Sequence, residues 1–283
     1  MQTIRLGGVP EHFNMPIHLA IEQELFSNKD IHVKWVEFPD GTGAMNKALR
    51  AGKIDMAIIL TEGITRDIAN GNPSKIIQNY VSSPLRWGVH VDAKSAFNTI
   101  DELESKRVAI SRMGSGSHIM AYVQALEKGW DTSTLELVEV GTVDKAIEAL
   151  SNKEADYFMW EHFTTKPLVD QGIFKRVGDF PTPWSSFVIA ATNDFIAEQK
   201  TIIKVFLQVL NAVTAQFKQV NEIEKSVAER YNQKVEDVQQ WLSLTSWAQK
   251  QISEEELKTV QKRLLELKMI DNISENDFLL KKL

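Results

Sequence analysis

MNKALRAGK at residues 45–53 is followed by Asp55, the apolar run MAIIL at 56–60, and Thr61-Glu62. A second stretch has the same order: VDKAIEAL at 143–150, a short Ser-Asn-Lys insertion, Asp156, YFMW at 157–160, and Glu161-His162. Each stretch predicts a short amphipathic helix, a turn, a buried strand, and a carboxylate where the strand ends. Ligands of doubly wound α/β sheets gather outside the carboxyl ends of the strands. The repeat therefore predicts two α/β lobes whose functional edges face one cleft.

The composition is that of a globular protein with enough apolar residues for two domains. The chain has 283 residues, of which 43% are hydrophobic and 25% charged, and its net charge is -6. It contains no basic block and no zinc-finger spacing, so nucleic acid is not an expected partner. The absence of cysteine excludes disulfides, thiol catalysis and cysteine-ligated metals.

The N-terminus MQTIRL enters a predicted strand at once, without the charged and apolar regions of a signal peptide. No apolar run reaches transmembrane length, so membrane insertion is not expected. The sequence as it stands predicts a cytoplasmic protein. A periplasmic or lipid-anchored protein whose signal was removed would give the same pattern.

Strands and helices alternate along the first part of the chain. Thr3–Leu6 and His32–Phe38 predict strands, and Pro16 suits the first turn of a helix between them. Further strands are expected at 75–81 and 86–91. This β-α-β order is typical of a parallel sheet with right-handed crossovers.

The alternation predicts a discontinuous first lobe and an inserted second lobe. The first lobe comprises residues 1–85 and 187–283, the latter ending in helices, and the second lobe comprises residues 86–186. The chain would cross between them near Leu85–Trp87 and Ser185–Phe187, which would form a hinge. In the C-terminal part, Ser253 and Glu256 predict a capping box.

The sharpest local motif is the loop SRMGSGSH at 111–118, between a predicted strand and a predicted helix. Glycines allow a ligand to approach the backbone, and the amides at a helix N-terminus favour an anion. The alternative interpretation is an ordinary serine-capped helix. Gly41-Thr42-Gly43 is interpreted as the equivalent loop of the first lobe. The candidate anion-binding residues of the longer loop are Arg112, Gly114, Ser115, Gly116, Ser117 and His118.

Histidine, carboxylate and aromatic residues cluster at other predicted strand ends. The loop Glu11-His12-Phe13-Asn14 follows the first strand, and Trp160-Glu161-His162 closes a strand of the second lobe. Paired His and Glu suit acid–base chemistry where they converge, but a specificity pocket is the favoured interpretation. The histidines show no metal-ligand spacing, so no metal is expected. Trp160 and Trp184 are preferred over Trp87 as residues that stack on a flat ligand.

Several motifs together resemble the type II periplasmic-binding-protein fold. The sequence is similar to the SsuA/THI5-like (NMT1-like) superfamily, which includes alkanesulfonate-, nitrate- and thiamine-precursor-binding proteins. The loop Val9–Asn14 departs from the small loop of the transport members and resembles a signal-less branch. The cysteine-rich iron-binding segment of thiamine-precursor synthases is absent. The residues that carry the resemblance are 16–20 with 25–26, 41–43 with 46–49, 52–57, 106–116 and 260–270.

The resemblance implies a two-lobed α/β protein, with a mixed, mostly parallel sheet in each lobe, that binds a small ligand in an interlobe cleft and closes about a hinge. The expected ligand is anionic, sulfonate-like or a flat heteroaromatic. No cofactor is expected, the protein is expected to be a monomer, and an ABC permease is the implied partner if the protein is exported. The alternatives are an enzyme on the same fold, acting on a pyrimidine or a carboxylated aromatic through His and Glu, and an effector-sensing module. The expected ligand contacts are Glu11, His12, Phe13, Asn14, Gly41, Thr42, Gly43, Thr61, Glu62, Arg112, Gly114, Ser115, Gly116, Ser117, His118, Trp160, Glu161, His162 and Trp184.

Overall fold

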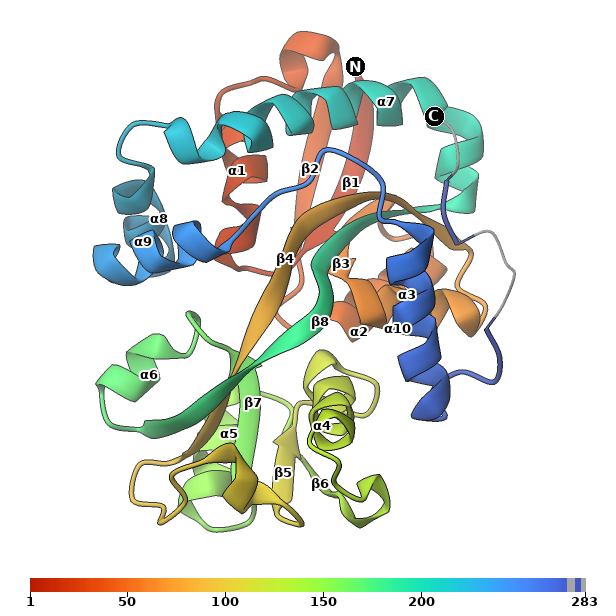
Figure 1. Ribbon diagram of the computed structural model, residues 1–283. Coiled ribbons are helices and arrows are strands. Elements are labelled where there is room, and N and C mark those ends of the chain that lie inside the picture. Colours follow the sequence, from red (N-terminus) through yellow and green to blue (C-terminus); the bar gives the residue numbers. More distant parts are fainter. Residues whose placement is uncertain (274–277, 281–283) are drawn as a thin grey trace. The chain divides into compact units, whose positions relative to one another are not determined.

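The computed structural model describes residues 1–273 and 278–280, and the chain divides into two compact units. Lobe 1 is made of Met1–Ser83 and Trp184–Leu283, and lobe 2 of Pro84–Pro183 (Figure 1). Within the described ranges, no helix combines the length and the apolar character needed to span a bilayer. The expected α/β fold with a mostly parallel sheet flanked by helices is confirmed.

The sheet of lobe 1 is built on three parallel strands. β1 pairs with β2 on one side and with β3 on the other, both in parallel, and β3 pairs antiparallel with residues 187–191 of β8. The strands concerned are β1 (Gln2–Gly8), β2 (Ile31–Glu37), β3 (Met56–Leu60), β4 (Ser74–Asp92) and β8 (Phe174–Thr192), in the order β2-β1-β3-β8-β4. β3 is almost wholly buried, as its continuous apolar sequence requires of a strand covered on both faces.

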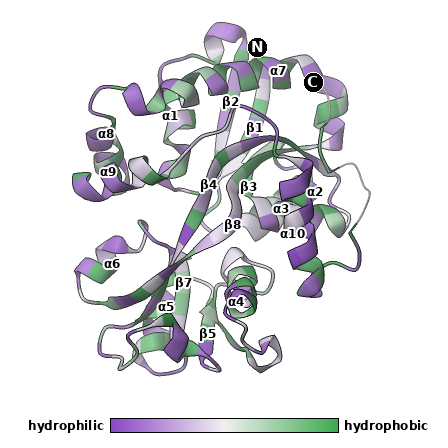
Figure 2. Ribbon diagram, viewed as in Figure 1, coloured by the Kyte–Doolittle hydropathy of each residue, from purple (hydrophilic) through white to green (hydrophobic). Residues whose placement is uncertain are grey.

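Helices cover the sheet of lobe 1. They are α1 (Met15–Glu22), α2 (Thr42–Arg50), α3 (Thr61–Ala69), α7 (Asn193–Gln216), α8 (Ile223–Tyr231), α9 (Val235–Leu244) and α10 (Glu254–Glu266). α10 packs beside α3, and α1 packs beside α7. Figure 2 shows α10 largely in purple, because most of its residues are hydrophilic; its apolar residues Leu257, Val260 and Leu264 are buried.

Lobe 2 repeats the strand plan of lobe 1. β5 pairs in parallel with β6 and β7, and β7 pairs antiparallel with β4. Its elements are β5 (Arg107–Ile110), α4 (Gly116–Glu127), β6 (Glu136–Glu139), α5 (Val143–Ser151), β7 (Tyr157–Glu161) and α6 (Lys166–Asp170). The strands expected at 75–81 and 86–91 are parts of the single strand β4, since the chain stays extended through Pro84.

The two helix–turn–strand units correspond at one constant offset, so the expected Ser-Asn-Lys insertion is wrong. α2 and α5 have equal length, and their buried residues Met45, Ala48 and Leu49 match Ala146, Ala149 and Leu150. The turn that follows each helix contains one left-handed residue, with φ 61° at Gly52 and φ 59° at Lys153. Because a glycine stands in one copy and a lysine in the other, aligning residue types shifts the register. The buried helix face and the turn conformation set the register in the folded chain.

The same correspondence corrects the pairing of the glycine loops. Gly41–Gly43 follows β2 and begins α2, whereas residues 111–118 follow β5 and begin α4. The counterpart of Gly41–Gly43 in lobe 2 is therefore Gly141-Thr142, before α5. The counterpart of residues 111–118 in lobe 1 is the loop between β1 and α1.

In each lobe an aspartate directly before one strand binds an arginine on the central strand, and this arginine–aspartate clasp was not predicted from the sequence. In lobe 2, Asp156 accepts hydrogen bonds from the Arg107 backbone amide (2.9 Å) and from its Nε (3.0 Å) and Nη2 (3.0 Å). In lobe 1, Asp55 accepts from the same three groups of Arg5. Each aspartate thus ties the start of its own strand to the neighbouring strand, which gives these residues a structural role.

Candidate functional site

Glu62 is the most unusual polar residue at a strand end in lobe 1. It lies in the first turn of α3, directly after β3, and its side chain is wholly buried. The indole Nε1–H of Trp184 donates to its Oε2 at 2.8 Å. Its Oε1 has no hydrogen-bond partner among the residues that the structure describes. Burial raises the pKa of Glu62 to about 7, against the smaller effects of its own backbone amide and of the indole, which favour the ionised form.

Thr61 and its neighbours fix the segment of β8 that enters lobe 1. The Thr61 hydroxyl donates to the Ser185 carbonyl at 2.6 Å, and Asn79 Nδ2 donates to the Ser185 hydroxyl at 2.9 Å. The Ser185 amide donates to Glu256 Oε1 at 2.6 Å. Only half of the expected capping box is present, because Ser253 accepts from the Glu256 amide while the Glu256 carboxylate serves Ser185 instead. Trp184 and Ser185 are therefore held on lobe 1 from three elements.

The Gly41–Gly43 loop brings α2 close to α3. Gly41 adopts φ 70°, which favours glycine, and caps α2. Thr42 packs against Gly63, where an added Cβ would lie 2.3 Å from the Thr42 methyl carbon. Asn46 Nδ2 donates to the Gly63 carbonyl at 3.2 Å. This loop is thus brought beside the residue that follows Glu62.

The loop after β1 is embedded in an aromatic cluster of lobe 1. His12 stacks on Phe13 with ring centroids 4.7 Å apart and meets the Trp241 ring edge-on at 4.3 Å. The Tyr80 hydroxyl donates to the Phe13 carbonyl at 2.9 Å. Burial lowers the pKa of His12 to about 3. Asn14 Nδ2 holds the loop by donating to the Val9 carbonyl at 2.8 Å. His12, Phe13 and Asn14 are buried, and Glu11 is half-buried.

The loop 111–118 of lobe 2 satisfies most of its own polar groups. The Ser117 hydroxyl accepts from the Ser111 amide at 3.0 Å, and Ser115 caps α4 by accepting from the His118 amide at 3.3 Å. His118 Nδ1 accepts from the Gly114 amide at 2.9 Å. Arg112 is half-buried; its backbone carbonyl accepts from the Ser115 amide at 3.1 Å, but its side chain makes no hydrogen bond or ion pair with the described part of the chain. The serines and His118 thus fix the conformation of the loop, and Arg112 is its positively charged residue.

Trp160 and Glu161 end β7 in lobe 2. Trp160 is half-buried and stacks on Phe158 with centroids 5.3 Å apart. Glu161 is buried, and its Oε2 accepts from the amide and the hydroxyl of Thr164 at 2.6 and 2.7 Å. Burial raises the pKa of Glu161, although the hydrogen bonds from Thr164 oppose this. Glu161 therefore orders the turn after β7.

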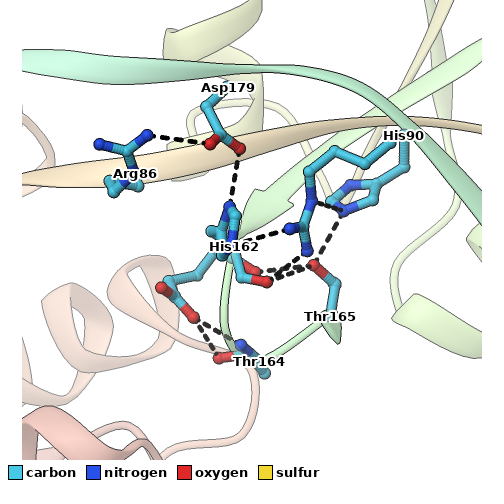
Figure 3. A network of polar contacts seen from close by, with 8 residues as sticks. Arg86, His90, His162, Thr164, Thr165 and Asp179 are labelled. Carbon is cyan, nitrogen blue, oxygen red and sulfur yellow. Dashed lines mark hydrogen bonds and ion pairs between the residues drawn. The ribbon is translucent and has the colours of Figure 1, made fainter. Parts of the chain in front are cut away.

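His162 lies at the centre of a polar network drawn in Figure 3. Its Nδ1 lies 2.8 Å from Asp179 Oδ1, and its Nε2 lies 2.8 Å from Arg176 Nη1. Because a guanidinium can only donate, His162 Nε2 accepts and the proton is on Nδ1, where it is donated to Asp179. Both ring nitrogens are therefore engaged within lobe 2.

The rest of the network ties β4 to β8. Arg86 on β4 pairs with Asp179 on β8 at 3.0 Å. Burial raises the pKa of Asp179, but the bonds from His162 and Arg86 outweigh this and lower it to about 2. Arg176 also lies 3.4 Å from His90 Nε2, and burial together with this positive charge lowers the pKa of His90 to about 3.

Residues 87–180 match the family described as Ca3427-like PBP (periplasmic binding protein). The chain is similar in structure to the CA3427 gene product of Candida albicans, which is described as having the generic periplasmic binding protein fold. For that pair the TM-score is 0.91 and the sequence identity 25%, with 100% of this chain and 97% of the other covered. This protein has the SsuA-type periplasmic-binding-protein fold.

Two bacterial proteins share this periplasmic-binding-protein fold at lower identity. The alkanesulfonate-binding protein SsuA from Xanthomonas axonopodis pv. citri, bound to MOPS, has a TM-score of 0.83 and 16% identity, with 99% of this chain and 98% of the other covered. The periplasmic aliphatic sulphonate binding protein SsuA from Escherichia coli has a TM-score of 0.73 and 18% identity, with 96% and 89% covered. No curated protein matches the chain.

In this periplasmic-binding-protein fold, the candidate residues form separate groups in each lobe. Lobe 1 joins Glu62 to Trp184 and encloses His12 and Phe13 in an aromatic cluster. In lobe 2, Glu161 and His162 lie on one turn. No group of three or more His, Cys, Asp or Glu residues in the described segments is arranged to hold a metal ion. The polar residues that the sequence did not indicate are Asn79, Arg86, His90, Arg176 and Asp179, and the bond from Ser185 to Glu256 was not expected either; the partners lie 14 or more residues away in sequence, so no local pattern reveals them.

Proposed function

We propose that this protein binds a small anionic molecule, such as a sulfonate, without converting it chemically. The observation that carries the proposal is the SsuA-type fold together with Arg112, a cation at the carboxyl end of β5 without an ionic partner in the described residues. A guanidinium forms strong paired hydrogen bonds with sulfonate or carboxylate oxygens. The amides of the first turn of α4 add favourable dipoles next to it.

We further propose that both lobes contribute to one ligand site and close about the crossing strands. Each lobe has candidate residues at the carboxyl ends of its own parallel strands, which supports this proposal. In the same proposal the chain acts as a monomer, and its partner is an ABC permease if it is exported. The match of residues 87–180 supports placing it in the Ca3427-like group.

The acid–base alternative is less well supported, because both histidines it requires are held in other roles. His12 is buried with a pKa lowered to about 3 by that burial, and His162 uses both ring nitrogens for Asp179 and Arg176. A general base needs a nitrogen within reach of the substrate proton. Of the two expected carboxylate partners, Glu11 and Glu161, Glu161 accepts from Thr164.

Calorimetric titration with a series of alkanesulfonates tests the proposal. Arg112→Ala is expected to weaken binding at least about tenfold, as for loss of a charge-assisted hydrogen bond. Lys128→Ala is the matched control, since it removes the same charge just after the other end of α4. Equal affinity of wild type and Arg112→Ala would refute the role of Arg112. If no sulfonate or carboxylate binds, the ligand class is wrong. Small-angle scattering with ligand should show a smaller radius of gyration if the lobes close.

A further inference from the structure

The Glu62–Trp184 pair joins a fully buried carboxyl group to the point where β8 enters lobe 1. Trp184 is the first residue of the second chain segment of lobe 1, and its indole donates to Glu62 Oε2 at 2.8 Å. The adjacent Ser185 is held by Thr61 and Glu256. The indole N–H of Trp184 is thus bonded to Glu62, while the backbone next to it is held by other residues.

Glu62 has too few hydrogen-bond donors for a buried carboxylate. An ionised carboxylate offers about four acceptor positions. The Glu62 carboxyl group has only the Trp184 indole N–H and its own backbone amide beside it, and Oε1 has no hydrogen-bond partner within the described chain. An uncompensated buried charge costs several kcal/mol. The protonated form of Glu62 is therefore favoured in the buried position. The ionised form is favoured where the side chain turns toward water and no longer bonds the indole.

The charged groups around Glu62 are engaged elsewhere or face solvent, except Arg66, whose Nε is buried without a hydrogen-bond partner among the described residues. Arg50 on α2 pairs with Asp67 at 2.9 Å, and Glu256 on α10 accepts from Ser185. Arg66, one turn further along α3, makes no ion pair with Glu62 in the described residues. β3 and residues 184–192 of β8 contain no charged side chain. The remaining charged groups of these helices are exposed or partly exposed: Lys47 on α2, and Glu254, Glu255, Lys258, Lys262, Arg263 and Glu266 on α10.

We propose that Glu62 is a positioning residue that holds the Trp184 indole only while it carries a proton, so that ligand binding is coupled to proton uptake. This inference rests on the proposed binding function, in which Trp184 contacts the ligand. Burial, which raises the pKa of Glu62 to about 7, places the change in the neutral range. Ligand affinity therefore falls as the pH rises above neutrality.

The direct test follows the Trp184 indole by NMR of ¹⁵N-tryptophan-labelled protein without ligand. Trp184→Phe identifies its N–H resonance by loss of one signal. In wild type this resonance should shift with a midpoint near the raised pKa of Glu62, about 7. In Glu62→Gln, whose amide oxygen accepts the indole N–H at every pH, it should not titrate. A resonance that does not move across neutral pH, or that titrates equally in Glu62→Gln, overturns the inference.

The binding test uses 1-butanesulfonate, whose charge is constant across the neutral range. Wild-type affinity should fall about tenfold per pH unit above the midpoint, and Glu62→Gln should keep the affinity that wild type shows at low pH. Equal pH dependence in the two proteins overturns the coupling to binding. If 1-butanesulfonate binds neither protein at any pH, the sulfonate class of the proposed function fails. The indole titration then still decides whether Glu62 holds Trp184 through its proton.

Discussion

Replacing Glu62 by Gln should change how the free energy of unfolding depends on pH. The pKa of Glu62 is 4.5 in an unfolded chain and about 7 in the folded protein. Each unit of difference corresponds to about 1.4 kcal/mol, so ionisation of Glu62 costs the folded state about 3 kcal/mol in total. A raised folded pKa means that the stabilisation is complete below pH 4.5 and is lost as the pH rises through about 7. Glutamine has the same shape and no charge, so Glu62→Gln should not show this loss.

Urea unfolding followed by tryptophan fluorescence, at a series of pH values from below 4.5 to above 7, measures the difference. The free energy of unfolding of Glu62→Gln minus that of wild type should grow by about 3 kcal/mol from the acid to the alkaline end. Glu255→Gln, on the exposed side of α10, is the control and should give a flat difference. A flat difference for Glu62→Gln would mean that the buried carboxyl group is ionised at neutral pH, and it would refute the reasoning.

Three further changes test the frame around the site by urea unfolding. Asp156→Asn should lower the free energy of unfolding by about 2 kcal/mol, because it weakens three hydrogen bonds from Arg107. An unchanged urea midpoint would show that the clasp does not stabilise the fold. Tyr80→Phe should cost about 1 kcal/mol and speed amide exchange in the loop after β1, since the Phe13 carbonyl loses its shorter donor and keeps only the longer bond from Trp247 Nε1 at 3.4 Å; unchanged exchange would contradict this. Asp179, with its pKa lowered to about 2, stabilises lobe 2 fully above pH 3.8 and loses this effect as the pH falls through about 2. Asp179→Asn should therefore have a lower free energy of unfolding at neutral pH, and that free energy should depend less on pH in acid.

Local patterns allowed most of the fold to be predicted from the sequence. The apolar run of β3 and the amphipathic pattern of α2 are complete within a few residues, and the same holds for β7 and α5. The register of the repeat was wrong because the left-handed position after each helix is Gly52 in one copy and Lys153 in the other. Backbone conformation at that turn follows from the packing of the helix, which residue type alone does not show.

The candidate site was predictable in its parts but not in its pairings. Glu62 and Trp184 were both selected from their positions at a strand end and at the hinge, but their hydrogen bond joins residues 122 apart. The partners of His162 are Asp179 and Arg176 on β8, which lie 17 and 14 residues further along the chain, beyond α6. No periodicity or motif in the sequence connects such positions, because only the folded sheet brings them together.

Burial disfavours the charged form of His12 and Glu62 in lobe 1 and of His90 and Glu161 in lobe 2, but lobe 2 also has half-buried arginines, and this bears on the proposed ligand. In lobe 1, burial lowers the pKa of His12 to about 3 and raises that of Glu62 to about 7, so that both are uncharged in mildly acidic solution. In lobe 2, Arg86 and Arg176 are cations held by Asp179 and His162, and Arg112 has no ionic partner in the described chain. A buried carboxylate in lobe 1 would repel an anion, whereas a protonated one would not. If both lobes contribute to one ligand site, as we propose, the proton on Glu62 and the charge on Arg112 favour the same anionic ligand, and anion affinity should require both.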